Sequence, residues 1–358
     1  MSVEAQLEER SQEEVTSQAF GFLGVDRFID TLVGARALKT AFELGLVDHL
    51  LTDGASGFDA LARRLDTEPA GLRFLVDLLC ASGVLTQDAR KQLRLTRDFR
   101  AALAWRDLLE TKLDFAGFAM NDFADHFTAM VRRPAQSPKG RLFDLFDYRR
   151  CFNTDVDSYR RTRAWMRLTS TLTRYEAGAC LTLHDFGRYA RMLDVGGNSG
   201  EFALQLCRRH AKLEVTVFDL PLVCEIGQEH VLGEPEHPRI GFVKADVRHD
   251  AMPQGHDLVT FKSMLHDWPE DEARRFIAKA VQALDAGGTL AIFERGPIDA
   301  AQAARSFSML PVMQFFGSYR EPQVYVAILG LLGMQEVSVQ TVQLDTPFFL
   351  VTARKPAA

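Results

Sequence analysis

The feature that most constrains the fold is a Gly-rich turn that follows a short apolar run near the middle of the chain. Residues 192–200 read Met-Leu-Asp-Val-Gly-Gly-Asn-Ser-Gly, and residues 201–209 continue with helical spacing. A buried strand that enters a helix through glycines lets the backbone approach a bound nucleoside closely. The pattern therefore predicts a nucleotide-binding α/β domain. Its candidate binding residues are Asp194, Gly196, Gly197 and Gly200.

The glycines do not have the spacing of a dinucleotide site. Two and five residues after Gly196 stand Asn198 and Glu201, where the NAD fingerprint requires glycine. Glu201 also lies at the predicted helix N-terminus, where its carboxylate repels a phosphate that the helix dipole would attract. S-Adenosylmethionine (AdoMet) is a nucleoside without phosphate. The turn therefore favours AdoMet and argues against a nicotinamide dehydrogenase.

The second half of the chain alternates β-rich runs with segments of helical spacing, which predicts a parallel sheet covered by helices. The expected strands are 192–195, 215–220, 240–243, 258–262 and 289–294. Two final runs, 336–342 and 348–354, are joined by a short turn and must therefore be antiparallel.

Two aspartates follow the second and third of these strands. Asp219 stands 25 positions after Asp194, at the end of its strand, where a carboxylate can accept hydrogen bonds from both ribose hydroxyls. Asp246 follows the next strand and can face the adenine amino group. Because both are in register with the Gly-rich turn, the three features together predict a nucleoside site.

Residues 20 to about 51 have helical spacing, which predicts two helices. A helix-turn-helix and a small hairpin at about 83–95 follow. This order is typical of a winged helix and raises DNA binding as an alternative. The second helix, Leu-Arg-Phe-Leu-Val-Asp-Leu-Leu, has too few basic residues to follow phosphates, and the net charge is −6. An interaction or dimerisation module is favoured. We expect a flexible tail (1–16), a winged-helix-like dimerisation domain (17–103), a helical connector contributing to the substrate pocket (104–180) and an AdoMet-binding domain (181–358).

Composition narrows the class of protein further. Apolar residues make up 47% and charged residues 25% of the 358 residues, a globular balance. The first 16 residues lack the apolar core of a signal peptide, and no run of about 18 apolar residues follows. The five cysteines are scattered without a Cys-x-x-Cys pair. We expect a cytoplasmic protein without a metal, a membrane anchor or a nucleic-acid partner.

At this point the motifs resemble a known family. Asp-Val-Gly-Gly at 194–197, Phe-Asp-Leu-Pro at 218–221, Ala-Asp at 245–246 and Lys-Ser-Met-Leu-His-Asp-Trp at 262–268 look like the plant and bacterial small-molecule O-methyltransferases of the caffeate and hydroxyindole type. The likeness runs from about Arg27 onward. It implies a Rossmann-like, seven-stranded methyltransferase sheet with a reversed last strand, AdoMet as cofactor, and an N-terminal domain that intertwines two subunits as a homodimer.

The resemblance also implies roles for single residues. Asp219 and Leu220 correspond to the ribose-binding positions, Asp246 and Val247 to the adenosine-binding positions, and Lys262 and Ser170 to positions near the cofactor. His266 corresponds to the general base, and Glu294 to the carboxylate that orients it. The implied reaction is in-line transfer of a methyl group to a hydroxyl of a small aromatic, pigment or secondary-metabolite acceptor.

The base assignment has a physical argument besides the resemblance. His266 immediately precedes a predicted helix opened by Asp267, Pro269 and Glu270, an arrangement typical of a capping box. A helix N-terminus favours the neutral imidazole, which can accept a proton. Such a positioned base contributes about 10² to 10⁴ in rate.

One departure from the family pattern leaves the chemistry open. The family's second orienting glutamate precedes an arginine, but Tyr319 precedes Arg320 here, unless a slip of two residues lets Glu321 serve. S-, N- or C-methylation, for example of a thioether acid or a tetrapyrrole, therefore stays an alternative, since alignment alone can drive such transfers. A regulatory protein that binds AdoMet without turnover is an alternative of another class. Arg320 is a candidate partner for an anionic substrate.

The acceptor pocket is predicted from segments that cover the acceptor in the family, and its methionines and aromatic side chains indicate an apolar acceptor. The candidates are Met120, Asn121, Phe152, Met166, Met309 and Met313.

Overall fold

The computed structural model describes residues 20–137, 140–299 and 306–357, which form two compact units. One unit contains residues 20–127 and 306–312, and the other contains the remaining described residues. The predicted connector, 104–180, is thus divided between them, because the long helix α7 (Arg106–Arg132) begins in one unit and ends in the other. The predicted tail, 1–16, lies outside the described residues.

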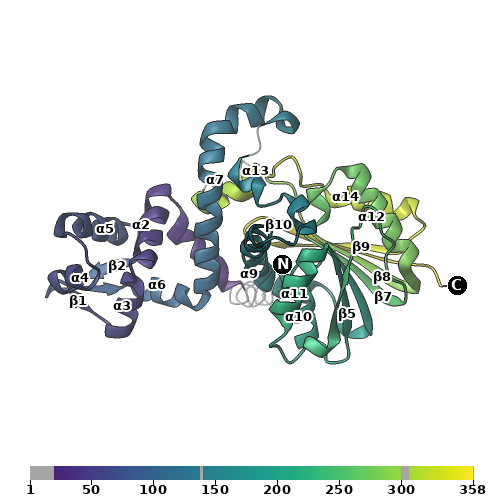
Figure 1. Ribbon diagram of the computed structural model, residues 1–358, viewed down its shortest axis with the longest axis horizontal. Helices are drawn as coiled ribbons and strands as arrows, with labels where there is room; N and C mark the ends of the chain where they lie inside the picture. The colour runs from purple at the N-terminus through teal and green to yellow at the C-terminus, as the bar shows by residue number, and fades with distance from the viewer. Residues whose placement is uncertain (1–19, 138–139, 300–305, 358) are drawn as a thin grey trace, which may run out of the picture. The chain divides into compact units, whose positions relative to one another are not determined.

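The N-terminal unit is a set of short helices with a small three-stranded sheet in the order β1-β3-β2 (Figure 1). Where we expected two helices before residue 51, the chain forms a 3-10 turn and two α-helices. The Thr31 hydroxyl begins the first α-helix by accepting the Gly34 amide hydrogen bond at 3.0 Å. The elements are η1 (Gly21–Ile29), α2 (Leu32–Glu43), α3 (Leu46–Asp53), β1 (Ser56–Gly57), α4 (Phe58–Arg64), α5 (Pro69–Ala81), β2 (Leu85–Gln87), β3 (Gln92–Leu95), α6 (Arg97–Ala102), η2 (Leu103–Trp105) and, late in the chain, η8 (Phe307–Met309).

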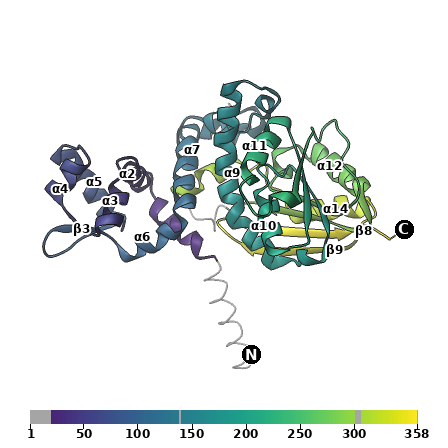
Figure 2. The same ribbon diagram turned by 60° about the horizontal axis from the view of Figure 1, so that its bottom comes forward.

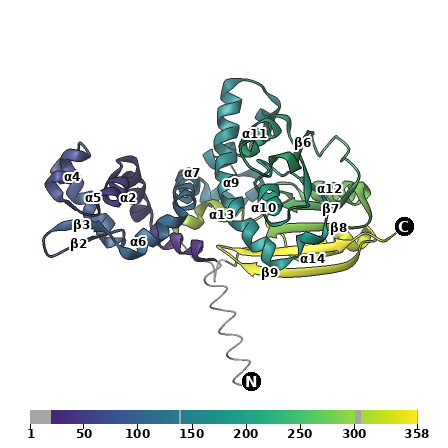
Figure 3. The same ribbon diagram turned by 90° about the horizontal axis from the view of Figure 1, so that it is seen from below.

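The C-terminal unit contains a seven-stranded sheet in the order β6-β5-β4-β7-β8-β10-β9. The first five of these are parallel, and β10 runs antiparallel to both of its neighbours. The predicted fold class, with its reversed last strand, is confirmed. Figure 3 shows the β9–β10 hairpin along one edge of the sheet. The strands are β4 (Arg191–Val195), β5 (Glu214–Asp219), β6 (Ile240–Lys244), β7 (His256–Lys262), β8 (Leu284–Arg295), β9 (Gln335–Gln343) and β10 (Pro347–Arg354).

Helices cover both faces of this sheet (Figures 1 and 2). One face carries α9 (Val156–Leu183), α10 (Glu201–Arg209) and α11 (Pro221–Val231), and the other carries α12 (Glu270–Ala283) and α14 (Pro322–Leu331). Between the second pair and the strands lies an apolar core that includes Val259, Phe276 and Ile277. The remaining helical segments are η3 (Pro134–Gln136), α8 (Arg141–Asp144), η4 (Tyr148–Phe152), η5 (Phe186–Arg188), η6 (His237–Arg239), η7 (Leu265–Asp267) and α13 (Leu310–Gln314). None of the described helices is long and apolar enough to cross a bilayer.

Candidate active site

In the Gly-rich turn between β4 and α10, the first two glycine positions have no room for a side chain. Gly196 has φ +70, and a Cβ there would lie 2.5 Å from Cγ of Met264. A Cβ on Gly197 would lie 2.6 Å from the Oδ2 atom of Asp194. Positions 196 and 197 therefore require glycine, while the contact of this turn with a cofactor stays a prediction.

Asp219 ends β5 beside this turn. Its Oδ2 accepts the Asn198 amide at 2.8 Å, and its Oδ1 accepts the Leu220 amide at 2.7 Å. Burial raises the pKa of Asp219 to about 6, against the effect of these two bonds. Each carboxylate oxygen keeps a lone pair, so the group can still accept from a ribose hydroxyl.

Two buried polar atoms beside the turn lack partners among the described residues. The Thr260 hydroxyl bonds Oδ1 of Asp194 at 2.7 Å, but Oδ2 of Asp194 and the Ser263 hydroxyl have no hydrogen bond. Burial raises the pKa of Asp194 to about 7. Because buried polar groups are rarely left unpaired, a ligand with hydrogen-bond donors fits here. A nucleoside carrying an amino-acid chain matches both the Asp219 and the Asp194 ends.

Other predicted cofactor residues already have protein partners. Asp246 is paired with Arg248 at 2.6 Å, and buried Val247 follows it. The Ser170 hydroxyl lies 2.5 Å from that of Ser199 in the Gly-rich turn. Ser170 thus contacts the Gly-rich turn, whereas Asp246 has much of its carboxylate occupied by Arg248.

Lys262 is part of a buried ion cluster that the sequence did not predict. Its Nζ donates to the Thr173 hydroxyl at 2.9 Å and to the Glu176 carboxylate of α9. Glu176 also accepts from Arg295 at 2.6 Å, and the three charged side chains are each at most 9% exposed. The cluster therefore ties α9 to the carboxyl ends of β7 and β8. The one signal in the sequence is a glutamate among the small, buried residues of this helix, such as Ala177 and Cys180.

His266 and Glu294 are brought together as the resemblance implies. Nδ1 of His266 lies 2.6 Å from Oε2 of Glu294, whose Oε1 accepts the backbone amides of Met264 and Leu265 at 2.9 and 2.7 Å. Glu294 is fully buried at the end of β8. With the glutamate fixed in this way, the imidazole has one orientation, which places its second nitrogen, Nε2, 3.4 Å from Oδ1 of Asp267.

The physical argument from the following helix proves wrong. Pro269 is the N-cap of α12, no side chain caps it, and His266 lies in the 3-10 turn η7. Burial lowers the pKa of His266, but Glu294 and Asp267 outweigh burial and raise the pKa above its ordinary value. The pKa of the imidazole is thus set by two nearby carboxylates and not by the weaker field of a helix N-terminus.

The structure also places Tyr319, Arg320 and Glu321, the segment that differs from the family pattern. The ring of Tyr319 packs against the imidazole of His266 at a centroid distance of 5.3 Å. Glu321 is exposed at the start of α14, so the slip of two residues does not bring its carboxylate to the histidine. Arg320 donates to the backbone carbonyls of Leu265 and Trp268 and so stabilises the turn that carries His266.

The acceptor residues predicted from the sequence belong to both units of the structure. Met166 is buried on α9, and Phe152 is 46% exposed at the end of η4. Met313 lies on α13, while Met120, Asn121 and Met309 belong to the N-terminal unit, and their roles stay predictions.

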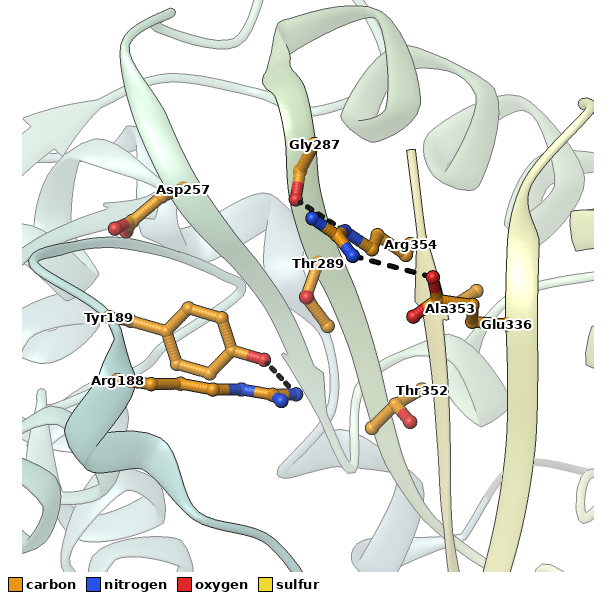
Figure 4. A pocket seen from close by; sticks show the side chains of 9 residues that line it. All are labelled: Arg188, Tyr189, Asp257, Gly287, Thr289, Glu336, Thr352, Ala353 and Arg354. Atoms are coloured by element: carbon orange, nitrogen blue, oxygen red, sulfur yellow. Dashed lines mark hydrogen bonds and ion pairs between the residues drawn. The ribbon is translucent and has the colours of Figure 1, made fainter. Parts of the chain in front are cut away.

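A pocket lies at the opposite, amino-terminal edge of the parallel strands (Figure 4). Its charged groups are satisfied within the protein. Arg354 bonds the Gly287 carbonyl and Glu336, Asp257 accepts two backbone amides, and Arg188 donates to the Tyr189 hydroxyl. Ligands of parallel sheets bind at the carboxyl ends of strands. The candidate active site is therefore the edge with Asp219 and His266.

Comparison with protein families gives two matches. The O-methyltransferase domain matches residues 129–335, which is more than half of the chain. The O-methyltransferase dimerisation domain matches residues 27–104.

Single relatives agree with these matches. The chain is 39% identical to 3-hydroxy-5-methyl-1-naphthoate 3-O-methyltransferase of Streptomyces sahachiroi over 139 residues, which are 37% of this chain and only 39% of that protein. It is 25% identical to acetylserotonin O-methyltransferase of Gallus gallus over 86% of this chain and 90% of that protein. The solved structure of human N-acetylserotonin methyltransferase with AdoMet superposes with a TM-score of 0.66 at 20% identity, covering 97% and 98% of the two chains.

Proposed function

This chain belongs to the O-methyltransferase family, and from that premise we propose that His266 is the general base that takes the proton of an acceptor hydroxyl. The enzyme uses AdoMet to methylate hydroxyl groups of small molecules. The observation that carries the proposal is the 2.6 Å contact between His266 Nδ1 and Glu294, which leaves Nε2 as the accepting atom.

The site residues have two tasks, which are binding of the cofactor and transfer of the acceptor proton. When bound, AdoMet supplies a methyl group on a positively charged sulfur. Asp219 and the Gly-rich turn, which meet at the ends of β4 and β5, would hold the nucleoside. His266 accepts the hydroxyl proton at Nε2 while the acceptor oxygen forms its bond to the methyl carbon and the carbon–sulfur bond breaks. The positive charge thus moves to the imidazole, where ionised Glu294 stabilises it.

We propose an aromatic acceptor, by analogy with the naphthoate and acetylserotonin named for the two relatives. Aromatic side chains in the C-terminal unit support this. Phe315 packs against Phe143 and Phe146 at 5.2 and 5.1 Å, and Phe146 packs edge-on against Trp165. Such a cluster offers faces on which a flat ring can stack.

The experiment that tests the activity uses methyl-labelled AdoMet with hydroxynaphthoates and other phenols, thioether acids and pigment precursors. We expect labelled phenol ethers. Label recovered only in sulfonium, N-methyl or C-methyl products would contradict hydroxyl transfer. Isothermal calorimetry with S-adenosylhomocysteine on the same preparation separates a missing acceptor from a protein that does not bind the cofactor.

Cofactor affinity should depend on pH and on Asp219. As pH falls from 8 to 5.5, Asp194 and Asp219 take up protons, because their pKa values are raised to about 7 and about 6. A neutral carboxyl group is a weaker hydrogen-bond acceptor, so we expect the affinity for S-adenosylhomocysteine to decrease as the pH is lowered. Substituting Asp219→Asn should weaken binding about 10- to 100-fold at pH 8, since bonds to charged groups contribute about 1.5–3 kcal/mol.

Calorimetry at several pH values checks both expectations. The control is Asp271→Asn, an exposed aspartate in the first turn of α12 that is not among the predicted cofactor residues. Equal affinity of Asp219→Asn and the unmodified protein at pH 8 would contradict the ribose assignment.

The N-terminal unit is the family's dimerisation domain and supports a homodimer. We propose that the second copy covers a groove of about 670 Å³ between α2 and α5, where Phe74, Val33 and Leu32 are 67%, 56% and 46% exposed. Exposed apolar patches of this kind mark protein interfaces.

Substituting Phe74→Glu should convert the dimer to a monomer, because the interface would have to bury an unpaired charge. Sedimentation velocity measures the change in mass. Leu232→Glu, at an equally exposed leucine after α11, is the matched control and should leave the dimer intact. A Phe74→Glu protein that still sediments as a dimer would place the interface elsewhere.

We also propose that the enzyme works in the cytoplasm. The five cysteines are all free, which agrees with a reducing compartment.

A further inference from the structure

A tyrosine far away in the sequence contacts the catalytic segment. Tyr148, at the start of η4, donates its hydroxyl to Oδ2 of Asp267 at 2.6 Å, across 119 residues of chain. Its ring stacks on Trp268 at 6.1 Å and meets the edge of Trp165 at 5.5 Å. Two aromatic neighbours and a short hydrogen bond thus fix the hydroxyl on one carboxylate oxygen.

The other oxygen of this carboxylate faces the imidazole. Oδ1 of Asp267 lies 3.4 Å from Nε2 of His266, and the Asp267 side chain is 14% exposed. The imidazole is therefore flanked on both nitrogens, by Glu294 at Nδ1 and by Asp267 at Nε2. Each carboxylate is itself held in place, Glu294 by two backbone amides and Asp267 by Tyr148.

We propose that Tyr148 is a positioning residue. Its hydroxyl holds the carboxylate of Asp267 beside the His266 imidazole, where Asp267 is the second carboxylate after Glu294. This inference rests on the proposed role of His266. It also accounts for Tyr319, which stands where the family has its second orienting glutamate. The second negative charge comes instead from Asp267, next to the histidine in sequence, and the Tyr148 hydroxyl of η4 holds it. Neither Tyr319 nor Glu321 supplies it, since one presents a ring and the other is exposed.

The proton balance shows what Asp267 contributes. Before transfer, Nε2 carries a lone pair and Asp267 is a near but unbonded charge. After the acceptor proton has moved to Nε2, the new N–H has a carboxylate oxygen 3.4 Å away, and the imidazolium lies between two negative groups. The charge that leaves the sulfur is thereby stabilised where it arrives, which strengthens His266 as a base.

Tyr148 matters because Asp267 is costly to keep ionised in this place. Burial raises the pKa of Asp267, while His266 and the Tyr148 hydrogen bond oppose that shift. The pKa of Tyr148 itself is raised well above its usual value by burial and by Asp267, so the hydroxyl remains a donor. The other groups that act on His266 are Glu294 and Arg295 of β8 and the ring of Tyr319.

Removing the hydroxyl alone, by Tyr148→Phe, should raise the pKa of Asp267 further and release its carboxylate from its position, and should thereby lower the pKa of His266. The measurement is an NMR titration of full-length protein with ¹⁵N-labelled histidine and bound S-adenosylhomocysteine, with the His266 signal identified by its loss in His266→Gln. We expect Asp267→Asn to lower the His266 pKa by about 1 unit or more, as for loss of an opposite charge at this range. Tyr148→Phe should shift it in the same direction, and the double variant should match Asp267→Asn.

The activity profile gives a second readout with any acceptor found for the enzyme. Activity requires neutral His266, so a lower pKa should move the acid limb of kcat to lower pH, while the plateau falls because the base is weaker. Tyr159→Phe is the matched control, because its hydroxyl bonds Glu229 at the surface and should change neither quantity. S-Adenosylhomocysteine affinity establishes that each variant is folded.

The outcomes separate this inference from the proposed function. An unchanged or raised His266 pKa in both Tyr148→Phe and Asp267→Asn would overturn the positioning role, even where His266→Ala is inactive. Full activity of His266→Ala would instead overturn the general-base mechanism on which the inference rests.

Discussion

Replacing His266 by alanine is expected to lower kcat for hydroxyl methylation by about 10² to 10⁴, the contribution of a positioned general base. In the described structure, the partners of the imidazole are Glu294, Asp267 and the ring of Tyr319. None of these three residues is among those predicted to bind the cofactor. The affinity for S-adenosylhomocysteine should therefore change little. Steady-state kinetics with a phenolic acceptor, together with calorimetry, measures both quantities on the same protein.

The control is His237→Ala, in the 3-10 turn η6 at the amino end of β6, whereas the site residues lie at the carboxyl ends of the strands. A His266→Ala enzyme that keeps most of its activity would show that alignment of the two substrates drives transfer, as expected for the S-, N- and C-methylation alternatives. A large loss with intact cofactor affinity would separate His266 from residues that only bind AdoMet.

The sequence predicts best what is decided locally. The strands of the parallel sheet contain short apolar runs, and four of the five were expected within two residues of their observed bounds, whereas β8 begins five residues earlier than expected. Asp219 was predictable because the carboxyl ends of parallel strands meet at one edge, so a carboxylate ending β5 must lie beside the Gly-rich turn after β4. The pairing of His266 with Glu294 came from the resemblance and not from spacing.

Contacts that depend on tertiary packing were not predictable. Glu176 meets Lys262 across 86 residues and Arg295 across 119, and Tyr148 meets Asp267 across 119, each through a helical segment packed on strand ends. No local periodicity indicates such pairs. The helix-capping argument for His266 failed for the same reason, because local spacing identified Asp267 as a cap, while packing directs its carboxylate to Tyr148.

Substituting Glu176→Ala should cost about 3–5 kcal/mol of unfolding free energy, the range for removing one partner of a buried ion pair. Glu176 bridges Lys262 and Arg295, and its pKa is lowered by those two cations in spite of burial. A carboxyl whose folded pKa is depressed stabilises at neutral pH and loses that effect only in acid. Its loss leaves Lys262 buried beside the Thr173 hydroxyl without a carboxylate.

The measurement is the urea midpoint of the full-length protein, and the exposed pair of Glu225 and Lys244 provides the comparison. Its two side chains are 47% and 46% exposed at a separation of 2.7 Å, so Glu225→Ala should cost no more than about 1 kcal/mol. Glu176→Gln, which keeps the shape and removes the charge, should resemble Glu176→Ala if charge is what matters. A Gln variant as stable as the unmodified protein would mean that packing of α9, and not the ion cluster, holds this helix over the strand ends that carry the active site.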